Sequence, residues 1–263
     1  MRLEIPSICD DTKMIVVEEF TLEDFRSIAF MLESDSDGEL YKLLISKVLT
    51  PCNSLDKFHA LLHARVKFVN ETIAFNNGTS NISINLNTWI KSFKADYVNI
   101  EKTIELDNFT LSLSYPEHFL YENMYDIVIE CISSIKFKDT EILLEDLSRD
   151  DKNTILEKLP PIILENIKTF IFENSDSELM LMKSMLDLPE VSVNFFDNSA
   201  YTVIKTLYSY YTYDDILELI FMLSAKLPDI QYINSRNPRD LEFLIRLYND
   251  EVAKSNQDDK SII

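Results

Sequence analysis

The chain has 263 residues and is strongly acidic, with 45 acidic against 25 basic side chains and a formal net charge of −20. Hydrophobic residues make up 46% of it, which excludes a disordered protein and is enough for a sizeable core. The charge disfavours nucleic acid and anionic membranes as partners, because binding phosphate groups requires Lys and Arg.

The N-terminal quarter is predicted to contain one strand and three helices. β-Branched and apolar residues over 12–20 indicate the strand. Thr21 is the expected N-cap of the first helix, because apolar side chains recur after it at helical spacing. Further helices are expected over 39–49 and 55–64, and Ser54 is the expected N-cap of the latter.

The apolar period changes to two between residues 65 and 115, which predicts strands. The Asn-Asn-Gly turn at 76–78 separates two of them, and Asn-Gly favours a hairpin because both residues tolerate positive φ. A short helix is expected over 88–93, around the single tryptophan. The pattern predicts an antiparallel meander of about four or five short strands.

Helices return after Pro116. We expect them over 122–135, 148–159 and 161–173, with a short acidic segment over 141–146. Ser148 opens the second of these and Pro161 suits the first turn of the third. The remaining predicted helices cover 177–187, 198–211, 213–226 and 238–254.

The predicted fold class is α+β, with N-terminal helices, a central small antiparallel β-meander and a mainly helical C-terminal half. We expect an α+β domain over 1–174, a helical extension over 175–254 and a flexible tail over 255–263. The sequence leaves open whether the extension forms a separate unit or packs on the sheet.

Motifs that support common catalytic chemistry are missing from the sequence. The two glycines, Gly38 and Gly78, are too far apart for a phosphate-binding loop or a dinucleotide fingerprint. No G-x-S-x-G stretch seats a serine nucleophile. Three scattered cysteines, without a C-x-x-C pair, indicate reduced thiols of a cytosolic protein. We therefore expect no cofactor and no enzymatic activity.

Two patterns could still carry chemistry. His59 and His63 have a metal-ligand spacing, but the Glu of the zincin motif and a third ligand are missing, so we expect no metal. Adjacent acidic pairs, such as Asp150-Asp151, are expected to favour helix starts or to be solvated. A carboxylate-based hydrolase remains the alternative, because glycosidases use two carboxylates.

Two side-chain clusters are candidates for binding a protein partner. Met-rich helical faces can repack against different partners, and Tyr combines apolar area with a hydroxyl group. Packing in the core is the more common role of such side chains. The candidate partner-binding residues are Met180, Met182, Met185, Tyr208, Tyr211 and Tyr213.

The order of several segments resembles the phage T4-type baseplate hub assembly protein family. The segments are TLEDFRSIAFMLESD (21–35), ELYKLLISKVLTPC (39–52), SLDKFHALLHARVKFVNETI (54–73), ISINL (82–86), LSLSYP (111–116), YDIVIECISSI (125–135) and LEDLSRDDKNTILEKLPPIILENIKTFIFEN (144–174). Two features depart from the family: the hairpin at 76–78 lacks the cysteines of some members, and the extension after about residue 175 is long.

The resemblance implies a non-enzymatic assembly factor, or chaperone, for the baseplate hub of a contractile-tailed bacteriophage. Its partners would be hub proteins and the tape-measure protein, and it would act in the host cytoplasm. The alternative is a minor structural subunit that stays in the virion baseplate. The oligomeric state is left open.

Overall fold

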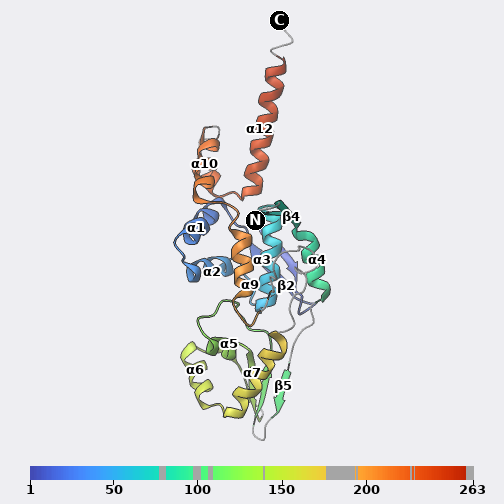
Figure 1. Ribbon diagram of the computed structural model, residues 1–263, viewed down its shortest axis with the longest axis vertical. Coiled ribbons are helices and arrows are strands. Elements are labelled where there is room, and N and C mark those ends of the chain that lie inside the picture. Colours follow the sequence, from blue (N-terminus) through green and yellow to red (C-terminus); the bar gives the residue numbers. More distant parts are fainter. Residues whose placement is uncertain are drawn as a thin grey trace.

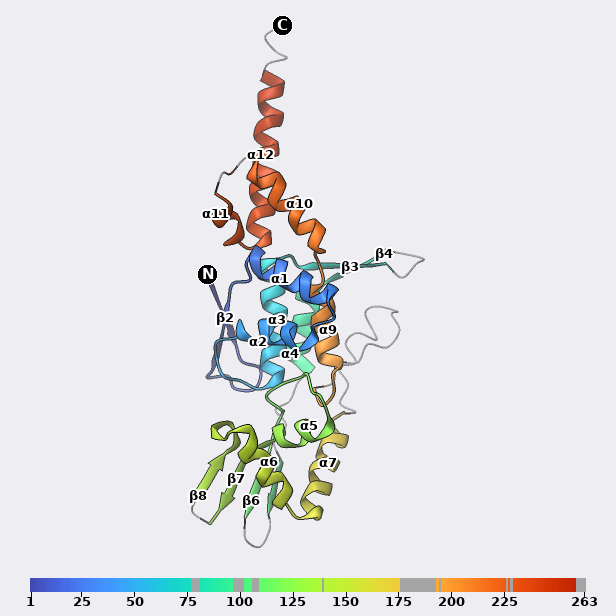
Figure 2. The ribbon, with the colours of Figure 1, turned by 90° about the vertical axis from the view of Figure 1, so that its left-hand side faces the viewer.

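The computed structural model describes residues 1–76, 81–96, 102–105, 109–138, 140–175, 193, 195–225, 227 and 229–258. Figures 1 and 2 show an elongated molecule with three parts along its long axis. We call them the central body (the described residues of 1–96 together with α9, Ser199–Tyr208), the sheet lobe (those of 102–175) and the helical end (those of 213–258).

The central body begins with a β-hairpin and three helices. These are β1 (Arg2–Pro6), β2 (Met14–Glu18), α1 (Leu22–Glu33), α2 (Asp37–Ser46) and α3 (Ser54–Phe68). The predicted N-cap of α1 is confirmed, because Thr21 and Asp24 form a capping box. The predicted cap of α3 is wrong: Ser54 is its first residue, and the Asn53 side chain accepts the Asp56 N–H at 3.0 Å.

Helix α3 is the centre of this part of the molecule. It extends four residues beyond the predicted end at 64, so the two-residue period does not begin at Arg65. Even its charged residues Lys57 and Arg65 are buried, because α3 is packed by β1, β2, α4, α9 and α12. A helix that is covered on most of its surface loses the polar face by which amphipathic helices are recognised.

The predicted hairpin around 76–78 is confirmed by pairing. Strands β3 (Thr72–Asn76) and β4 (Asn81–Asn85) are antiparallel, with Ile73 opposite Ile84. The turn itself lies outside the described residues. The two strands form a sheet of their own, because α4 (Leu86–Asp96) follows at once and is longer than the predicted helix over 88–93.

The sheet lobe contains a four-stranded antiparallel sheet in the order β5-β6-β7-β8. Its elements are β5 (Lys102–Glu105), β6 (Thr110–Leu113), α5 (Met124–Glu130), β7 (Ile132–Phe137), β8 (Thr140–Leu143), the 3-10 helix η1 (Leu144–Asp146), α6 (Arg149–Lys158) and α7 (Pro161–Ser175). Ser148 and Pro161 take the predicted N-cap and first-turn positions of α6 and α7.

One predicted helix is half wrong. The segment 122–135 is helical only to Glu130, and its second half is strand β7. Burial alternates along the start of β7, where Ile132 and Ser134 are buried, and pairing with β6 and β8 satisfies its backbone. The acidic segment 141–146 is β8 followed by η1. The β7–β8 turn gave no sequence signal, because Lys138 occupies the positive-φ position (54°) that Gly or Asn usually takes.

The C-terminal part contributes α9, α10 (Tyr213–Ser224), α11 (Ile230–Asn234) and α12 (Pro238–Asp258). Helix α9 packs on α3: the Tyr208 hydroxyl donates to Leu61 O at 2.9 Å, and Arg65 Nε donates to Leu207 O at 2.8 Å. The rings of Tyr208, Phe20 and Phe25 also contact one another, with centroids 5.0–6.2 Å apart. This part of the predicted extension therefore completes the core of the central body. The helix predicted over 177–187 lies outside the described residues.

Candidate functional site

The predicted partner-binding tyrosines have different environments. Tyr208 is 0% exposed and is a core residue, so it cannot contact a partner in this fold. Tyr211 is half-buried, and its hydroxyl donates to Glu242 Oε1 at 2.7 Å, which joins the start of α10 to α12. Tyr213 is also half-buried. The three methionines, Met180, Met182 and Met185, lie outside the described residues, so their predicted role stays a prediction.

Exposed apolar side chains gather instead at the helical end of the molecule. Helix α10 is covered on the face of Ile216, Leu219 and Leu223, whereas Phe221 on another face is 77% exposed. A single exposed apolar residue is common on protein surfaces, whereas a contiguous exposed apolar region indicates an interaction site.

Such a region lies between α10 and α12. We call it the α10–α12 groove; it has a volume of about 510 Å³. Its walls are Met222, Leu223, Leu227, Leu244, Ile245, Leu247, Tyr248 and Asn249. Leu223 of α10, in the wall of the groove, and Leu241 of α12 are buried. The sequence signal was present as the apolar spacing of the predicted helices 213–226 and 238–254, but it did not show which side chains stay exposed.

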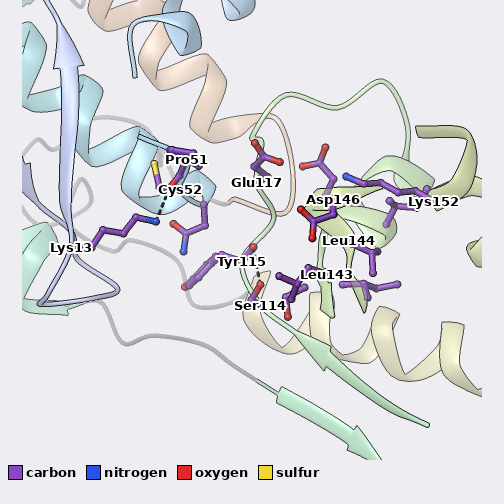
Figure 3. Close-up of a pocket in the computed structure, with 15 residues that line it drawn as sticks. Lys13, Pro51, Cys52, Ser114, Tyr115, Glu117, Leu143, Leu144, Asp146 and Lys152 are labelled. Carbon is purple, nitrogen blue, oxygen red and sulfur yellow. Dashed lines mark hydrogen bonds between the residues drawn. The ribbon is translucent and has the colours of Figure 1, made fainter. Parts of the chain in front are cut away.

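A second hollow lies between the central body and the sheet lobe. We call it the interlobe cleft; it has a volume of about 600 Å³. Figure 3 shows Lys13 and Cys52 on the central-body side and Asp146 and Lys152 on the sheet-lobe side, with Glu117 between them. Glu130 also lines this cleft.

Two glutamates of the cleft have opposite electrostatic environments. Burial raises the pKa of Glu130 to about 7. Burial also tends to raise the pKa of Glu117, but Lys57 outweighs this effect and holds the pKa below its usual value. Lys57 Nζ donates to both Glu117 O and Glu117 Oε1 at 3.0 Å.

These glutamates hold the segment that leads from β6 to α5. The His118 N–H donates to Glu130 Oε2 at 2.9 Å, and the Tyr41 hydroxyl accepts the Phe119 N–H at 3.0 Å. Burial, with a further contribution from Lys57, lowers the pKa of His118 to about 4, so its ring is neutral at pH 7. These hydrogen bonds connect α2, α3 and α5 through one backbone segment, and they therefore stabilise the fold.

The other candidates from the sequence have local partners. The Nε2 atoms of His59 and His63 are 3.1 Å apart, so one ring donates a hydrogen bond to the other. Within the described ranges, no group of three or more His, Cys, Asp or Glu side chains could hold a metal ion. Of the acidic pairs, Asp151 and Asp215 complete helix caps with Ser148 and Thr212.

The three cysteines, Cys9, Cys52 and Cys131, are not joined to one another by disulfide bonds. Burial raises the pKa of the Cys52 thiol, which lines the interlobe cleft, to about 12. Burial also raises the pKa of Cys131. Both groups are therefore protonated and weakly nucleophilic at neutral pH.

The sequence profile of a family described as T4 bacteriophage base plate protein matches residues 4–178. The chain belongs to this family. The match covers about two thirds of the 263 residues, from β1 to just beyond α7, and therefore includes the interlobe cleft but not α9 to α12. No curated protein and no solved structure matches the chain.

Membership of this family places the protein in the baseplate of a phage, either in the virion or during its assembly in the host. Interaction with other phage baseplate proteins is part of such a role. Within the described parts of the chain, no helix combines the length and the apolar character that crossing a bilayer requires.

Proposed function

We propose that this baseplate protein is a non-enzymatic assembly factor for the baseplate hub. It would act by covering apolar surface on an unassembled hub or tape-measure protein until that partner enters the baseplate. The observation that carries the proposal is the α10–α12 groove, an apolar surface that the described residues leave exposed at one end of the molecule. The net charge of −20 supports it, because a highly charged protein keeps itself and a bound apolar partner in solution.

Co-expression tests whether the protein binds the hub. The chain would be produced together with each hub protein and the tape-measure protein of the same phage, and complexes would be isolated by size-exclusion chromatography. We expect a stable complex with at least one of them. If none of these proteins forms a complex, the proposed function is wrong.

Mass spectrometry of purified tails separates an assembly factor from a structural subunit. An assembly factor leaves before the tail is complete, so we expect the protein in infected cells but not in finished tails. A stoichiometric amount in finished tails would instead support the second candidate, a minor structural subunit of the hub. In that case the same apolar groove would be a permanent interface.

The interlobe cleft favours one further candidate, a carboxylate-based hydrolase. Its support is the pairing of Glu130, whose pKa is about 7, with a second carboxylate whose pKa is lowered. We prefer a structural role for both groups, because Glu130 accepts the His118 N–H and Glu117 is bound to buried Lys57. The test is a panel of glycosides and peptides. If the wild type hydrolyses any of these compounds and Glu130→Gln does not, the result would support the hydrolase.

A further inference from the structure

The α10–α12 groove lies between the last turn of α10 and residues 244–249 of α12. Helix α10 has 12 residues and α12 has 21. At a rise of about 1.5 Å per residue, α12 is roughly 13 Å longer than α10. The start of α12 is anchored on the central body, where Arg239 donates to Val66 O at 3.0 Å. Figure 2 shows the other end of α12 projecting beyond α10, and the α12 residues that line the groove, 244–249, precede this end in the sequence.

The lining of the groove is uncharged throughout. Seven of its eight residues are apolar or aromatic, and the eighth is Asn249. Met222, Leu247 and Tyr248 are 44%, 46% and 41% exposed, so each has apolar surface still to bury. An apolar groove between two helices fits the apolar face of a third helix, with side chains at i, i+3, i+4 and i+7. Met222 adds a side chain that can adapt to the occupant.

The surrounding charge decides between two possible occupants. Acidic side chains outnumber basic ones in residues 213–258, as in the whole chain. Exposed Glu218 lies on α10, one turn before Met222. Arg246 stands between the lining residues Ile245 and Leu247 in the sequence, and its guanidinium lies 3.7 Å from the Glu242 carboxylate. A second copy of this chain would bring the same negative charge to the groove, whereas a helix with Lys and Arg beside its apolar face would be attracted.

From this geometry and charge we propose that the α10–α12 groove binds an amphipathic helix of a baseplate partner whose apolar face is flanked by Lys and Arg. The proposal rests on the proposed function and names the chemistry of the partner segment. Binding buries the exposed parts of Met222, Leu247 and Tyr248, and the basic flanks lie against the acidic surface of the helical end. Complex formation is therefore salt-sensitive, because exposed charge pairs are screened.

The test uses the full chain and the complex obtained by co-expression. Leu247→Asp places a charge in the groove at a side chain that is already 46% exposed, so the fold tolerates it. Leu49→Asp is the matched control, since Leu49 is 42% exposed and lies in the central body. We expect Leu247→Asp to weaken the complex at least about tenfold, and Leu49→Asp to leave it within about twofold.

A photo-crosslinking residue at position 247 identifies the occupant. We expect a crosslink to a partner segment with helical apolar spacing and flanking Lys or Arg. A crosslink to a second copy of this chain, or to an acidic or non-helical segment, would overturn the inference. Equal binding by wild type and Leu247→Asp would overturn it, although the complex formed by the wild type would still support a role in hub assembly through another surface. Failure of the wild type to bind any hub or tape-measure protein would remove both the inference and the proposed function.

Discussion

At the scale of single residues, the burial of Glu130 makes the free energy of unfolding depend on pH. Its pKa in the folded protein is raised to about 7, so the folded chain holds this proton more tightly than the unfolded chain does. The contribution of Glu130 to the free energy of unfolding is therefore largest at low pH. It decreases as the pH rises from the ordinary glutamate value toward about 7.

Glu130→Gln removes this penalty and keeps an oxygen that can accept the His118 N–H. We expect the variant to unfold with a free energy about 1–3 kcal/mol higher than wild type at pH 8, and nearly the same near pH 4. Urea unfolding at the two pH values measures both differences. An equal change at both would show that the effect does not come from ionisation.

Arg65 is a buried cation without a carboxylate partner among its described hydrogen bonds. Its guanidinium donates to Leu207 O, to Asn70 O at 2.7 Å and to Asn70 Oδ1 at 3.2 Å. It also lies 4.7 Å from the centre of the Tyr210 ring. Burial lowers the pKa of Arg65, and the fixed geometry of the guanidinium serves all three acceptors.

Arg65→Lys keeps the charge but loses this geometry. We expect it to lower the free energy of unfolding by about 2–4 kcal/mol, because a buried ammonium would leave acceptors unsatisfied. Arg26→Lys is the control, since Arg26 makes an exposed pair with Glu23, and we expect a change below about 0.5 kcal/mol. Thermal or urea unfolding of the two variants decides the comparison.

At the scale of elements, caps that depend on neighbouring residues were predictable. Thr21 was the expected N-cap of α1, because apolar side chains follow it at helical spacing, and the structure adds reciprocal hydrogen bonds between Thr21 and Asp24. The start of α3 was missed by one residue because Asn53 and Ser54 are both good caps. Which of the two residues caps the helix depends on the path of the chain before α3. That path is set partly by a distant residue, because the Ser54 N–H donates to Pro116 O.

Removing the cap of α1 has a defined cost. Thr21→Ala leaves the Asp24 N–H without its side-chain acceptor, so we expect a loss of about 1 kcal/mol in the free energy of unfolding. Thr206→Ala in the last turn of α9 is the control, because the Thr206 hydroxyl donates to Thr202 O and caps no backbone N–H among the described hydrogen bonds. A loss for the control as large as that for Thr21→Ala would contradict the capping explanation.

The segment 122–135 illustrates what spacing cannot decide. Its apolar residues fit a helix throughout, yet the helix ends at Glu130 and β7 follows. The difference comes from β6 and β8, which supply hydrogen-bond partners on both sides of β7. Strand pairing is a long-range interaction, so a local pattern of short apolar runs cannot reveal it.

At the scale of the whole molecule, the hydrophobic core includes residues that lie beyond the segment matched by the family profile. The match ends at residue 178, but α9 packs on α3 and Tyr208 fills the space beside Phe20 and Phe25. A chain that ends at residue 178 would expose these aromatic rings and leave Arg65 without Leu207 O. Large apolar surface uncovered in this way destabilises the fold and promotes aggregation.

We therefore expect the fragment 1–178 to lack a cooperative unfolding transition, measured by circular dichroism during urea titration. A chain that ends at Asp258 is the control and should unfold as the full chain does. A cooperative, monomeric fragment 1–178 would instead establish the predicted boundary at residue 174 as the limit of an independently folding domain.

The sequence by itself determined the α+β class, most helices, the β3–β4 hairpin, the acidic character and the relation to the baseplate family. These features depend on residues a few positions apart or on composition. Only the tertiary structure decided that Tyr208 is a core residue, that burial raises the pKa of Glu130 to about 7 and that the described residues form an apolar groove beside α12. Burial decides all three, and burial is set by which distant segments of the chain come to lie together.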